Sequence, residues 1–434
     1  MYLFMRLIYT LLLYLLTPFI LLRLYWKGRR LPAYRHRILE RFSLSPSISS
    51  EAVEVWLHAV SLGEVVAATP LIEALLLKQW RVLVTTMTPT GSQQVIQRFG
   101  RRVSHQYVPY DFPWALRRFL KKYQPHLCII METELWPNLI HQAARVSLPL
   151  LLANARLSDR SFKSYEKMRW MFKPILQQFT AILAQSEEDA KRFVALGAPL
   201  TSVQVLGNIK FDVPLTGTSE SSVSPLGVQW AKDRIVVMAA STHHDEERQL
   251  LLRLNQLKLA IPNVLLLFAP RHPERFQVVY QQCLAEGFRT GVRSSPSTID
   301  SSIDVLVIDS LGELLSFYQH ADYAFVGGSL VPVGGHNVLE PIAVQVPVFC
   351  GSYMMNSKEI CRDLLKAKAM VMVNNADELT AEIIAMHQNQ PRKFQQVENA
   401  TAVFVANQGT VARYMEKIEW VYAHSITVSM CVSK

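Results

Sequence analysis

Two motifs in the first half of the chain place carboxylates where chemistry could occur. Residues 58–64 end an apolar run and put Glu64 at the start of a helix-like stretch. A glutamate in a first helical turn usually just interacts favourably with the helix dipole, and position alone favours that interpretation. The alternative is a general base that takes the proton of an acceptor hydroxyl, with Gly63 allowing close approach of a substrate.

The second motif, residues 131–138, carries Glu132 and Glu134 at the end of an apolar run. Helix capping explains one carboxylate but two less easily, because neighbouring carboxylates repel and raise each other's pKa. Lys210 lies in residues 207–212, just before a polar segment. It is either a solvated surface charge or a point charge that neutralises a departing phosphate.

A glycine-rich segment, residues 327–340, is the most informative stretch of the second half. Its four glycines are expected to supply exposed backbone N–H groups, and the helix start that follows adds positive dipole. The pattern therefore predicts a phosphate site. Glu340, about one turn after Asn337, could accept hydrogen bonds from ribose hydroxyls, and Arg271 could bind a phosphate through two N–H groups.

His243, His244 and Asp245 form a cluster that invites a metal interpretation. Adjacent histidines point in different directions, however, and no pair of carboxylates of the DxD type accompanies them. We therefore expect no metal here.

The elements that position these motifs alternate between short apolar runs and helix-like stretches, which predicts two parallel sheets of βαβ units. Ligands bind beyond the carboxyl ends of such strands, and the motifs all fall there. The predicted division is an anchor at 1–30, a Rossmann-like domain at 31–213, a linker at 214–227, a second Rossmann-like domain at 228–424 and a tail at 425–434. The apolar runs are 55–59, 81–85, 127–131, 148–153, 181–184, 235–240, 264–269, 305–308, 323–326 and 346–350.

Residues 7–22 are uncharged and mostly Leu, Ile, Tyr and Phe. The run is slightly shorter than the roughly 20 residues that cross a bilayer, so Arg6 and Arg23 must snorkel if it spans. A shallow seat in one leaflet and a buried core helix are the alternatives. No small-residue cleavage site follows, so we expect a retained anchor. The basic cluster after it favours a cytoplasmic body and anionic lipids.

The charge and cysteine content narrow the class of protein further. The chain has 434 residues, is half hydrophobic and carries a formal net charge of +10, which disfavours disorder and favours an anionic partner. It has no basic block with interleaved aromatics, so nucleic acid is not expected. Five scattered cysteines without a CxxC pair indicate a reducing cytosol.

The chain resembles the 3-deoxy-D-manno-octulosonic acid (Kdo) transferases of lipopolysaccharide synthesis, up to about Gln408. Five motifs carry the resemblance, in family order: SLGE, ETELWPN, GNIKFD, PRHPERF and GGHNVLE. The resemblance implies a GT-B fold and inverting transfer of Kdo from CMP-Kdo to a lipid A precursor of the lipid IV-A type. The place would be the cytoplasmic face of the inner membrane, without a cofactor or metal.

The family's roles carry over to matching positions. The resemblance implies that Glu64 is the catalytic base and that Glu134 and Lys210 support the transition state. One departure is Asp245, where the family has a glycine, and residues 425–434 match nothing in it. The implied CMP contacts are Pro270, Arg271, Leu311, Gly312, Glu313, Asn337, Val338, Leu339 and Glu340.

Two other functions fit parts of the pattern. The first is a membrane-associated GT-B glycosyltransferase that uses a UDP- or GDP-sugar. The second is a non-catalytic membrane sensor or scaffold that keeps a sugar-nucleotide pocket. The presence of Glu64, Glu134 and Lys210 argues against the non-catalytic function. Trials with different sugar donors distinguish the first function from Kdo transfer.

Overall fold

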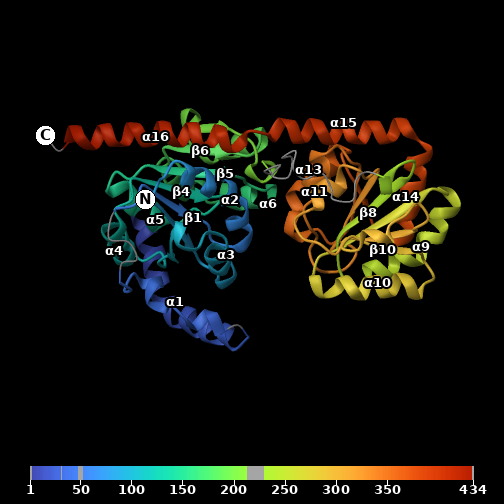
Figure 1. Ribbon diagram of the computed structural model, residues 1–434. Coiled ribbons are helices and arrows are strands. Elements are labelled where there is room, and N and C mark those ends of the chain that lie inside the picture. Colours follow the sequence, from blue (N-terminus) through green and yellow to red (C-terminus); the bar gives the residue numbers. More distant parts are fainter. Residues whose placement is uncertain (1, 31, 47–51, 213–228, 433–434) are drawn as a thin grey trace. The chain divides into compact units, whose positions relative to one another are not determined.

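The computed structural model describes residues 2–30, 32–46, 52–212 and 229–432, which form two compact units. The N-terminal unit comprises Met1–Asp212 together with Gly409–Lys434, and the C-terminal unit comprises Val213–Gln408. Figure 1 shows both units coloured along the chain. The predicted linker at 214–227 lies outside the described residues.

Seven described strands form a parallel sheet in the N-terminal unit, in the order β3-β2-β1-β4-β5-β6-β7. Its central strands are buried on both faces and read as continuous apolar runs, as expected for a parallel sheet covered by helices. The strands are β1 Val55–His58, β2 Val82–Thr86, β3 Ser104–Tyr107, β4 Leu127–Met131, β5 Leu150–Ala155, β6 Ala181–Ala184 and β7 Val203–Val205.

The helices of this unit begin at recognisable signals. The Ser61, Thr88, Ser158 and Ser186 side chains accept the first-turn N–H groups of α2, α3, α6 and α8. The helices are α1 Tyr2–Arg30, α2 Leu62–Leu77, α3 Pro89–Phe99, α4 Pro113–Tyr123, α5 Pro137–Arg145, α6 Asp159–Glu166, α7 Arg169–Leu176, α8 Glu187–Leu196 and α16 Thr410–Val432, with 3-10 turns η1 Pro32–Arg35, η2 Ile38–Phe42, η3 Gly100–Arg102, η4 Leu200–Ser202 and η5 Ile209–Phe211.

The C-terminal unit holds a second parallel sheet of seven described strands, in the order β10-β11-β9-β8-β12-β13-β14. The predicted α/β class with two Rossmann-like parts is therefore confirmed. The strands are β8 Ile235–Thr242, β9 Val264–Pro270, β10 Thr290–Val292, β11 Val305–Val307, β12 Tyr323–Val326, β13 Val348–Gly351 and β14 Val371–Val373. The helices are α9 Glu246–Ala260, α10 Phe276–Ala285, α11 Leu314–Tyr318, α12 Leu339–Ala343, α13 Lys358–Lys366, α14 Ala376–Gln388 and α15 Gln390–Asn407, with turns η6 Gln229–Ala231, η7 Pro273–Arg275, η8 Pro296–Thr298 and η9 Met355–Ser357.

The end of the chain corrects one predicted boundary. Residues 409–424 were expected in the second domain, but α16 packs on the N-terminal unit, where Tyr414, Met415 and Ile418 share a core cluster with Leu71 and Ile129. The physical reason is the apolar face of α16, whose residues recur at helical spacing and cover the sheet of the first unit. The predicted tail is a continuation of this helix as far as Val432.

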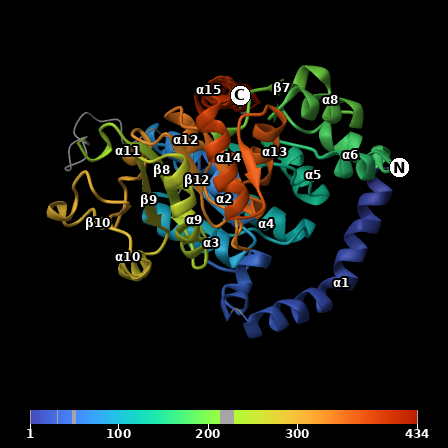
Figure 2. The ribbon, with the colours of Figure 1, turned by 90° about the vertical axis from the view of Figure 1, so that its right-hand side faces the viewer.

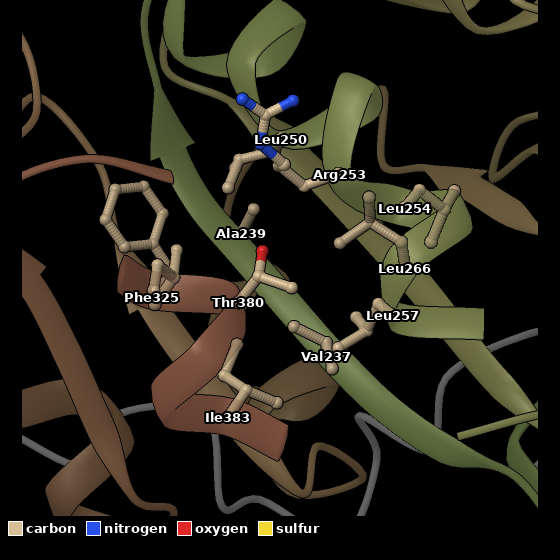
Figure 3. A pocket seen from close by; sticks show the side chains of 11 residues that line it. Val237, Ala239, Leu250, Arg253, Leu254, Leu257, Leu266, Phe325, Thr380 and Ile383 are labelled. Atoms are coloured by element: carbon tan, nitrogen blue, oxygen red, sulfur yellow. The ribbon is translucent and has the colours of Figure 1, made fainter. Parts of the chain in front are cut away.

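The core of the C-terminal unit contains a small cavity between β8, α9 and α14 (Figure 3). Its volume of about 20 Å³ leaves room for a single water at most. The lining is almost wholly aliphatic, with Val237, Ala239, Leu254 and Ile383 pointing toward one another. The cavity is therefore a packing gap and holds no substrate.

The order of the strands fixes where each unit can bind a ligand. In the N-terminal unit the chain changes direction across the sheet between β1 and β4, and in the C-terminal unit between β8 and β12. Crevices open at such switch points, beyond the carboxyl ends of the strands. The loops that flank them carry Glu64 and Glu132 in the first unit, and His243 and Gly327 in the second.

One described helix, α1, has the length and apolar composition of a membrane span. Its stretch Phe4–Arg29 has a mean hydropathy of 2.0, and only 6% of the scored window is buried. That exposure argues against the alternative of a buried core helix. Figure 2 shows α1 as a long helix along the edge of its unit.

Candidate active site

Glu64 lies in the first turn of α2, at the switch point of the first sheet. Its carboxylate accepts hydrogen bonds from the Val60 N–H at 2.8 Å and from the Ser61 hydroxyl at 2.8 Å. The Ser61 hydroxyl in turn accepts the Glu64 N–H at 3.4 Å, so Ser61 is the N-cap residue of α2. A Cβ on Gly63 would meet only the Ser61 Oγ at 3.9 Å, which leaves open space beside the carboxylate.

The surroundings of Glu64 tune its acidity. Only 8% of the residue is exposed, and this burial raises the pKa of its carboxyl to about 7. The hydrogen bonds from Ser61 and Val60 oppose the shift, whereas the negative charges of Glu134 and Glu132 add to it. A carboxylate with a pKa near the working pH is a suitable general base, because it is ionised yet basic enough to accept a proton.

Glu132, Glu134 and Lys210 gather beside Glu64. The Lys210 ammonium lies 3.0 Å from a carboxylate oxygen of Glu132, and both side chains are about four-fifths buried. Glu132 sits in the left-handed region, with φ 56°, a conformation that non-glycine residues adopt at a cost. Glu134 accepts the indole N–H of Trp136 at 2.7 Å, and burial raises the pKa of its carboxyl.

The fold therefore brings together Glu64, Glu134 and Lys210, the three residues predicted for this unit, and adds Glu132 as a fourth. Glu132 is the residue that sequence reasoning left without a role, although its position two residues before Glu134 was the available signal. Its carboxylate accepts a hydrogen bond from the Lys210 ammonium at 3.0 Å, which helps to orient the lysine. The strained backbone of Glu132 has no signature in the sequence.

The loop that carries Lys210 is held by residues far away in the sequence. The Asn154 side-chain oxygen Oδ1 accepts the Ile209 N–H at 3.1 Å, and the Tyr414 hydroxyl donates to the Leu183 and Gly207 backbone carbonyls at 3.0 and 3.3 Å. Asp212 accepts the N–H groups of Gly409 and Val411, at the start of α16. Helix α16 therefore fixes residues 207–212, the lysine loop, through these hydrogen bonds.

An apolar pocket of about 580 Å³ lies in the same unit, between α1 and the loops that follow the central strands. Trp136, which hydrogen-bonds Glu134, forms part of its wall. Its volume is typical of ligand pockets and its wall is mostly aliphatic and aromatic, with basic groups added. The basic lining residues are Arg23, Lys27 and Arg41.

The glycine-rich loop of the C-terminal unit differs from its prediction. The N–H groups of Gly328, Ser329 and Leu330 all donate to the buried carboxylate of Glu246, at 2.7 to 3.0 Å. The N–H groups of the remaining glycines donate to backbone carbonyls within the unit: Gly327 to Ala240, and Gly334 and Gly335 to Gly328. The expectation of exposed glycine N–H groups was therefore wrong.

The physical reason is charge compensation inside the unit. Glu246 is fully buried, and the concave row of N–H groups supplies the donors that a buried carboxylate needs. A Cβ on Gly327 would lie 2.7 Å from the Ser241 oxygen and 2.9 Å from Glu246, so glycine is required for this close packing. The loop is a pre-formed scaffold that presents the following residues, 336–340.

Among those following residues, Glu340 lies near enough to Arg271 for the arginine charge to act on it. Asn337 accepts the Leu339 N–H at 3.0 Å and donates to Glu340 at 3.1 Å, which fixes the glutamate side chain. Burial raises the pKa of Glu340, whereas Asn337 and the charge of Arg271 lower it. Arg271 leaves the end of β9 beside Pro270 and is exposed. Val338 and Leu339 are buried, so any contact with a ligand uses their backbone.

The third predicted part of the donor site, residues 311–313, lies directly before α11. Leu311 is 67% exposed, and a Cβ on Gly312 would meet nothing within 4 Å. Glu313 pairs with Arg293 at 2.6 Å. Burial acts to raise the pKa of Glu313, but hydrogen bonds from Arg293 and Ser310 hold it below its ordinary value. Arg293 was not predicted as part of this turn.

Histidines line the switch point of this second sheet. The Nε2 atoms of His243 and His336 lie 2.8 Å apart, and His272 packs edge-on against His243. His244 instead lies near Asp245 at the surface, so the two adjacent histidines point in different directions. Among the described residues there is no group of three or more side chains that could hold a metal ion.

Asp245, the departure from the family's glycine, has φ 73°. That is the left-handed region, which glycine adopts without strain. The loop shape that the sequence left in doubt is thus the one a glycine would favour, with an aspartate in its place.

Comparisons with known proteins found relatives that cover most of the chain. Residues 36–213 match the family model described as 3-Deoxy-D-manno-octulosonic-acid transferase (kdotransferase). A 3-deoxy-D-manno-octulosonic acid transferase from Haemophilus influenzae is 38% identical over 418 residues, which cover 95% of this chain and 98% of the relative. Another from Bordetella pertussis is 35% identical and covers 85% of this chain and 87% of the relative.

Solved structures are similar in fold. UDP-GlcNAc 2-epimerase from Neisseria meningitidis, bound to UDP-GlcNAc, is 12% identical with a TM-score of 0.50, covering 83% of this chain and 98% of that chain. Such likenesses concern the fold alone and support the predicted GT-B class. The C-terminal CMP-Kdo binding domain of WaaA from Acinetobacter baumannii is 34% identical over 40% of this chain and 91% of that domain, with a TM-score of 0.39.

Proposed function

Because the chain belongs to the 3-deoxy-D-manno-octulosonic acid (Kdo) transferase family, we propose that it transfers Kdo from CMP-Kdo to a lipid A precursor of the lipid IV-A type. The acceptor, the inverting course and the roles of single residues are parts of this proposal. Each is supported by the chemistry of the two units.

The transfer step is a single displacement in which Glu64 acts as the base. An acceptor hydroxyl oxygen bonds to the anomeric carbon of Kdo, the bond from that carbon to the phosphate oxygen breaks, and CMP leaves with the electron pair. The hydroxyl proton passes to Glu64. Attack from the face opposite the leaving group inverts the anomeric centre. The pKa of about 7 suits Glu64 to this task at neutral pH.

Lys210 and Glu134 stabilise the charges that develop. Negative charge grows on the departing phosphate, and the Lys210 ammonium offers a compact positive charge to balance it. Glu132 holds that ammonium in place at 3.0 Å. The partly buried Glu134 carboxylate, fixed by Trp136, balances the positive charge that grows on the sugar ring as the bond to CMP lengthens. Both roles are positional and require the strand-end loops to stay rigid.

The donor nucleotide binds to the C-terminal unit. In this proposal Arg271 binds the CMP phosphate, Glu340 accepts hydrogen bonds from the ribose hydroxyls, and the backbone around Pro270, Asn337, Val338 and Leu339 completes the contacts. The turn of Leu311, Gly312 and Glu313 binds the cytosine. Support comes from the charge coupling of Arg271 with Glu340 and from the open space above Gly312.

The lipid acceptor binds to the N-terminal unit. The 580 Å³ pocket matches an amphiphile, because its apolar wall suits acyl chains while Arg23, Lys27 and Arg41 suit phosphate groups. Trp136 links the pocket wall to the carboxylate cluster, so an acyl chain there would leave the sugar headgroup near Glu64. We place the body on the cytoplasmic side of the inner membrane, where the basic residues after α1 meet anionic lipids.

The observation that carries the proposal is Glu64, a buried carboxylate with a raised pKa beside the Lys210–Glu132 pair. Replacing Glu64 with Gln keeps the shape but removes the base, so Kdo transfer should fall by about 10²-fold or more. The matched control is Glu73→Gln, at a partly exposed position of the same helix, where Glu73 pairs with Arg102. If Glu64→Gln turned over like Glu73→Gln, the base assignment would be refuted.

Donor trials test the chemistry as a whole. Purified protein in detergent should transfer from CMP-Kdo and not from UDP- or GDP-sugars. Transfer from a UDP-sugar, together with no transfer from CMP-Kdo, would contradict the proposal. Calorimetry with CMP separates a folded but inactive preparation from a wrong donor.

A further inference from the structure

Two histidines of the C-terminal unit meet nitrogen to nitrogen. His243 follows β8 and His336 follows the glycine-rich loop after β12, and these two strands are parallel neighbours in the sheet. The Nε2 atoms lie 2.8 Å apart, whereas the ring centroids are 5.1 Å apart and the ring planes differ by only 1°. The rings therefore lie edge to edge in one plane, joined by a hydrogen bond between the two nitrogens.

This hydrogen bond and the surroundings fix the protonation of the pair. A neutral imidazole carries one hydrogen, so one Nε2 atom donates while the other accepts and keeps its hydrogen on Nδ1. Burial, and then neighbouring cationic groups, lower the pKa of His336 to about 4. Burial also lowers the pKa of His243. Both rings are therefore neutral at pH 7.

Gly328 makes room for the pair. A Cβ at this position would lie 3.0 Å from the Cδ2 atom of His336 and 3.3 Å from the Cδ2 atom of His243. The φ of Gly328 is 66°, in the left-handed region that glycine adopts freely. The backbone of the glycine-rich loop is thus shaped so that the two imidazoles can meet at the end of the sheet.

The charges that act on His336 favour an anion. They come from His243, Arg271 and His272, none of which is acidic. Arg271 forms no salt bridge within the parts of the chain that the structure describes. An anion beside His336 would therefore meet a guanidinium charge and ring N–H donors.

The carboxylates closest to His243 already have partners. Glu247 pairs with Arg275 at 3.1 Å. Glu246 accepts the backbone N–H of His243 at 2.9 Å, together with three N–H groups of the glycine-rich loop. Their negative charges are thus balanced by donors of their own, which lessens the repulsion of an anion at the histidines.

The proposed donor carries two anionic groups. One is the phosphate of CMP, and the other is the carboxylate of Kdo, a 2-ulosonic acid in which this group is bonded directly to the anomeric carbon. The charge of Arg271 acts on Glu340 and on both His243 and His336. With Glu340 at the ribose and Arg271 at the phosphate, the histidines are the neighbours of Arg271 that are left for the sugar carboxylate.

We propose that His243 and His336 form the binding site for the carboxylate of the donor sugar. One histidine moves its hydrogen from Nδ1 to Nε2, and each Nε2–H then donates to one carboxylate oxygen in place of the N–H···N bond. Both rings stay neutral, and Arg271 supplies the positive charge. A sugar without a carboxylate offers no such acceptor, so the site favours ulosonic acid donors over hexoses. This inference rests on the proposed function, because it takes CMP-Kdo as the donor.

Calorimetric binding of CMP and of CMP-Kdo, without acceptor, tests the site. His336→Leu removes the ring donor and should weaken CMP-Kdo binding about ten- to a hundredfold, since the lost hydrogen bond has a charged acceptor. The Kd for CMP, which has no carboxylate, should stay unchanged. His336→Gln restores a neutral N–H donor and should recover most of the loss. His244→Leu, at the exposed neighbouring histidine, is the matched control and should bind both ligands as the parent does.

Two results would overturn the proposal. An equal loss of affinity for CMP and for CMP-Kdo in His336→Leu would place the phosphate on the histidines instead of the carboxylate. Binding by His336→Gln as weak as that by His336→Leu would show that a neutral donor is not what the site provides. If thermal unfolding shows that His336→Leu does not fold, His243→Leu and His243→Gln take its place with the same expectations.

The neutral state of the pair gives a further test. Because no proton is taken up with the carboxylate, the Kd for CMP-Kdo should be nearly constant between pH 6 and pH 8, and a tenfold weakening per pH unit would overturn the proposal. The outcomes also separate this site from the proposed function. A parent chain that binds CMP-Kdo but transfers no Kdo would refute the transfer alone. A parent that transfers Kdo, with CMP-Kdo binding unaffected in His336→Leu and His243→Leu, would refute the histidine site alone.

Discussion

At the scale of single residues, Glu64 combines two roles that the sequence presented as alternatives. Its carboxylate completes the first turn of α2 through Ser61 and Val60, and it also has the buried, carboxylate-rich surroundings of a base. Capping and catalysis share the same geometry, because the hydrogen bonds that cap the helix also fix the direction of the carboxylate. A position in the sequence cannot separate them, but the burial of the residue can.

The pKa of Glu64 gives a testable pH dependence. Only the deprotonated carboxylate accepts a proton, so kcat/KM should rise about tenfold per pH unit below pH 7 and level off above it. The raised pKa means that this inflection lies well above the ordinary range for glutamate. A profile of initial rates from pH 5 to pH 9 at low acceptor concentration checks it. A profile flat between pH 5.5 and 8 would contradict the assignment.

Asp245 gives a prediction about stability. Its φ of 73° is unfavourable for a residue with a Cβ, so Asp245→Gly should stabilise the C-terminal unit by up to about 1 kcal/mol. Asp245→Ala removes the same carboxylate but keeps the Cβ and should bring no such gain. Urea unfolding followed by fluorescence measures both variants. A gain from alanine equal to that from glycine would assign the effect to the charge instead.

At the scale of elements, the central strands and their ends were predictable, whereas long-range partners and the strands β3, β7, β10 and β14 were not. Apolar runs such as Leu127–Met131 predict buried strands. The motifs come directly after these runs, because ligands in parallel sheets bind beyond the carboxyl ends of the strands. Glu246, however, fills the glycine loop from 82 residues away, and no local pattern links the two. The Glu246 carboxylate accepts the backbone N–H groups of this loop that were predicted to bind a phosphate.

Helix α16 illustrates the same limit. Its apolar spacing predicts that the helix packs against a sheet but does not show which sheet. Residues 409–424 were therefore assigned to the second domain, although they belong to the N-terminal unit. The hydrogen bonds from Gly409 and Val411 to Asp212 join the helix to the lysine loop. These contacts connect segments about 200 residues apart.

The hydrogen bonds between Asp212 and the start of α16 predict the effect of Asp212→Ala. Loss of a carboxylate that caps a helix costs about 1 kcal/mol, so the N-terminal unit should unfold at lower urea. The lysine loop should loosen too, lowering kcat more than it raises KM for CMP-Kdo. Glu416→Ala, at an exposed position of α16, is the control and should behave as the parent. Unchanged unfolding of Asp212→Ala would show that the contacts carry little energy.

At the scale of the whole molecule, the two units divide the work between catalysis and donor binding. Glu64→Gln should leave the Kd for CMP unchanged, because Glu64 belongs to the N-terminal unit and CMP is proposed to bind to the C-terminal unit. Glu340→Gln should weaken CMP binding about ten- to a hundredfold, since hydrogen bonds to charged groups contribute about 1.5–3 kcal/mol. Isothermal titration of each variant with CMP measures both. A weakened affinity for CMP in Glu64→Gln would argue against the division.

The most direct test of the account is the mass of the lipid product. The protein is incubated with CMP-Kdo and a phosphorylated lipid A precursor that carries no Kdo, and the lipid is analysed by mass spectrometry. We predict a product heavier by one or more Kdo residues, present with the parent and with Glu73→Gln and absent with Glu64→Gln. A precursor left unmodified by folded, CMP-binding protein, or an equal yield from Glu64→Gln, would contradict it.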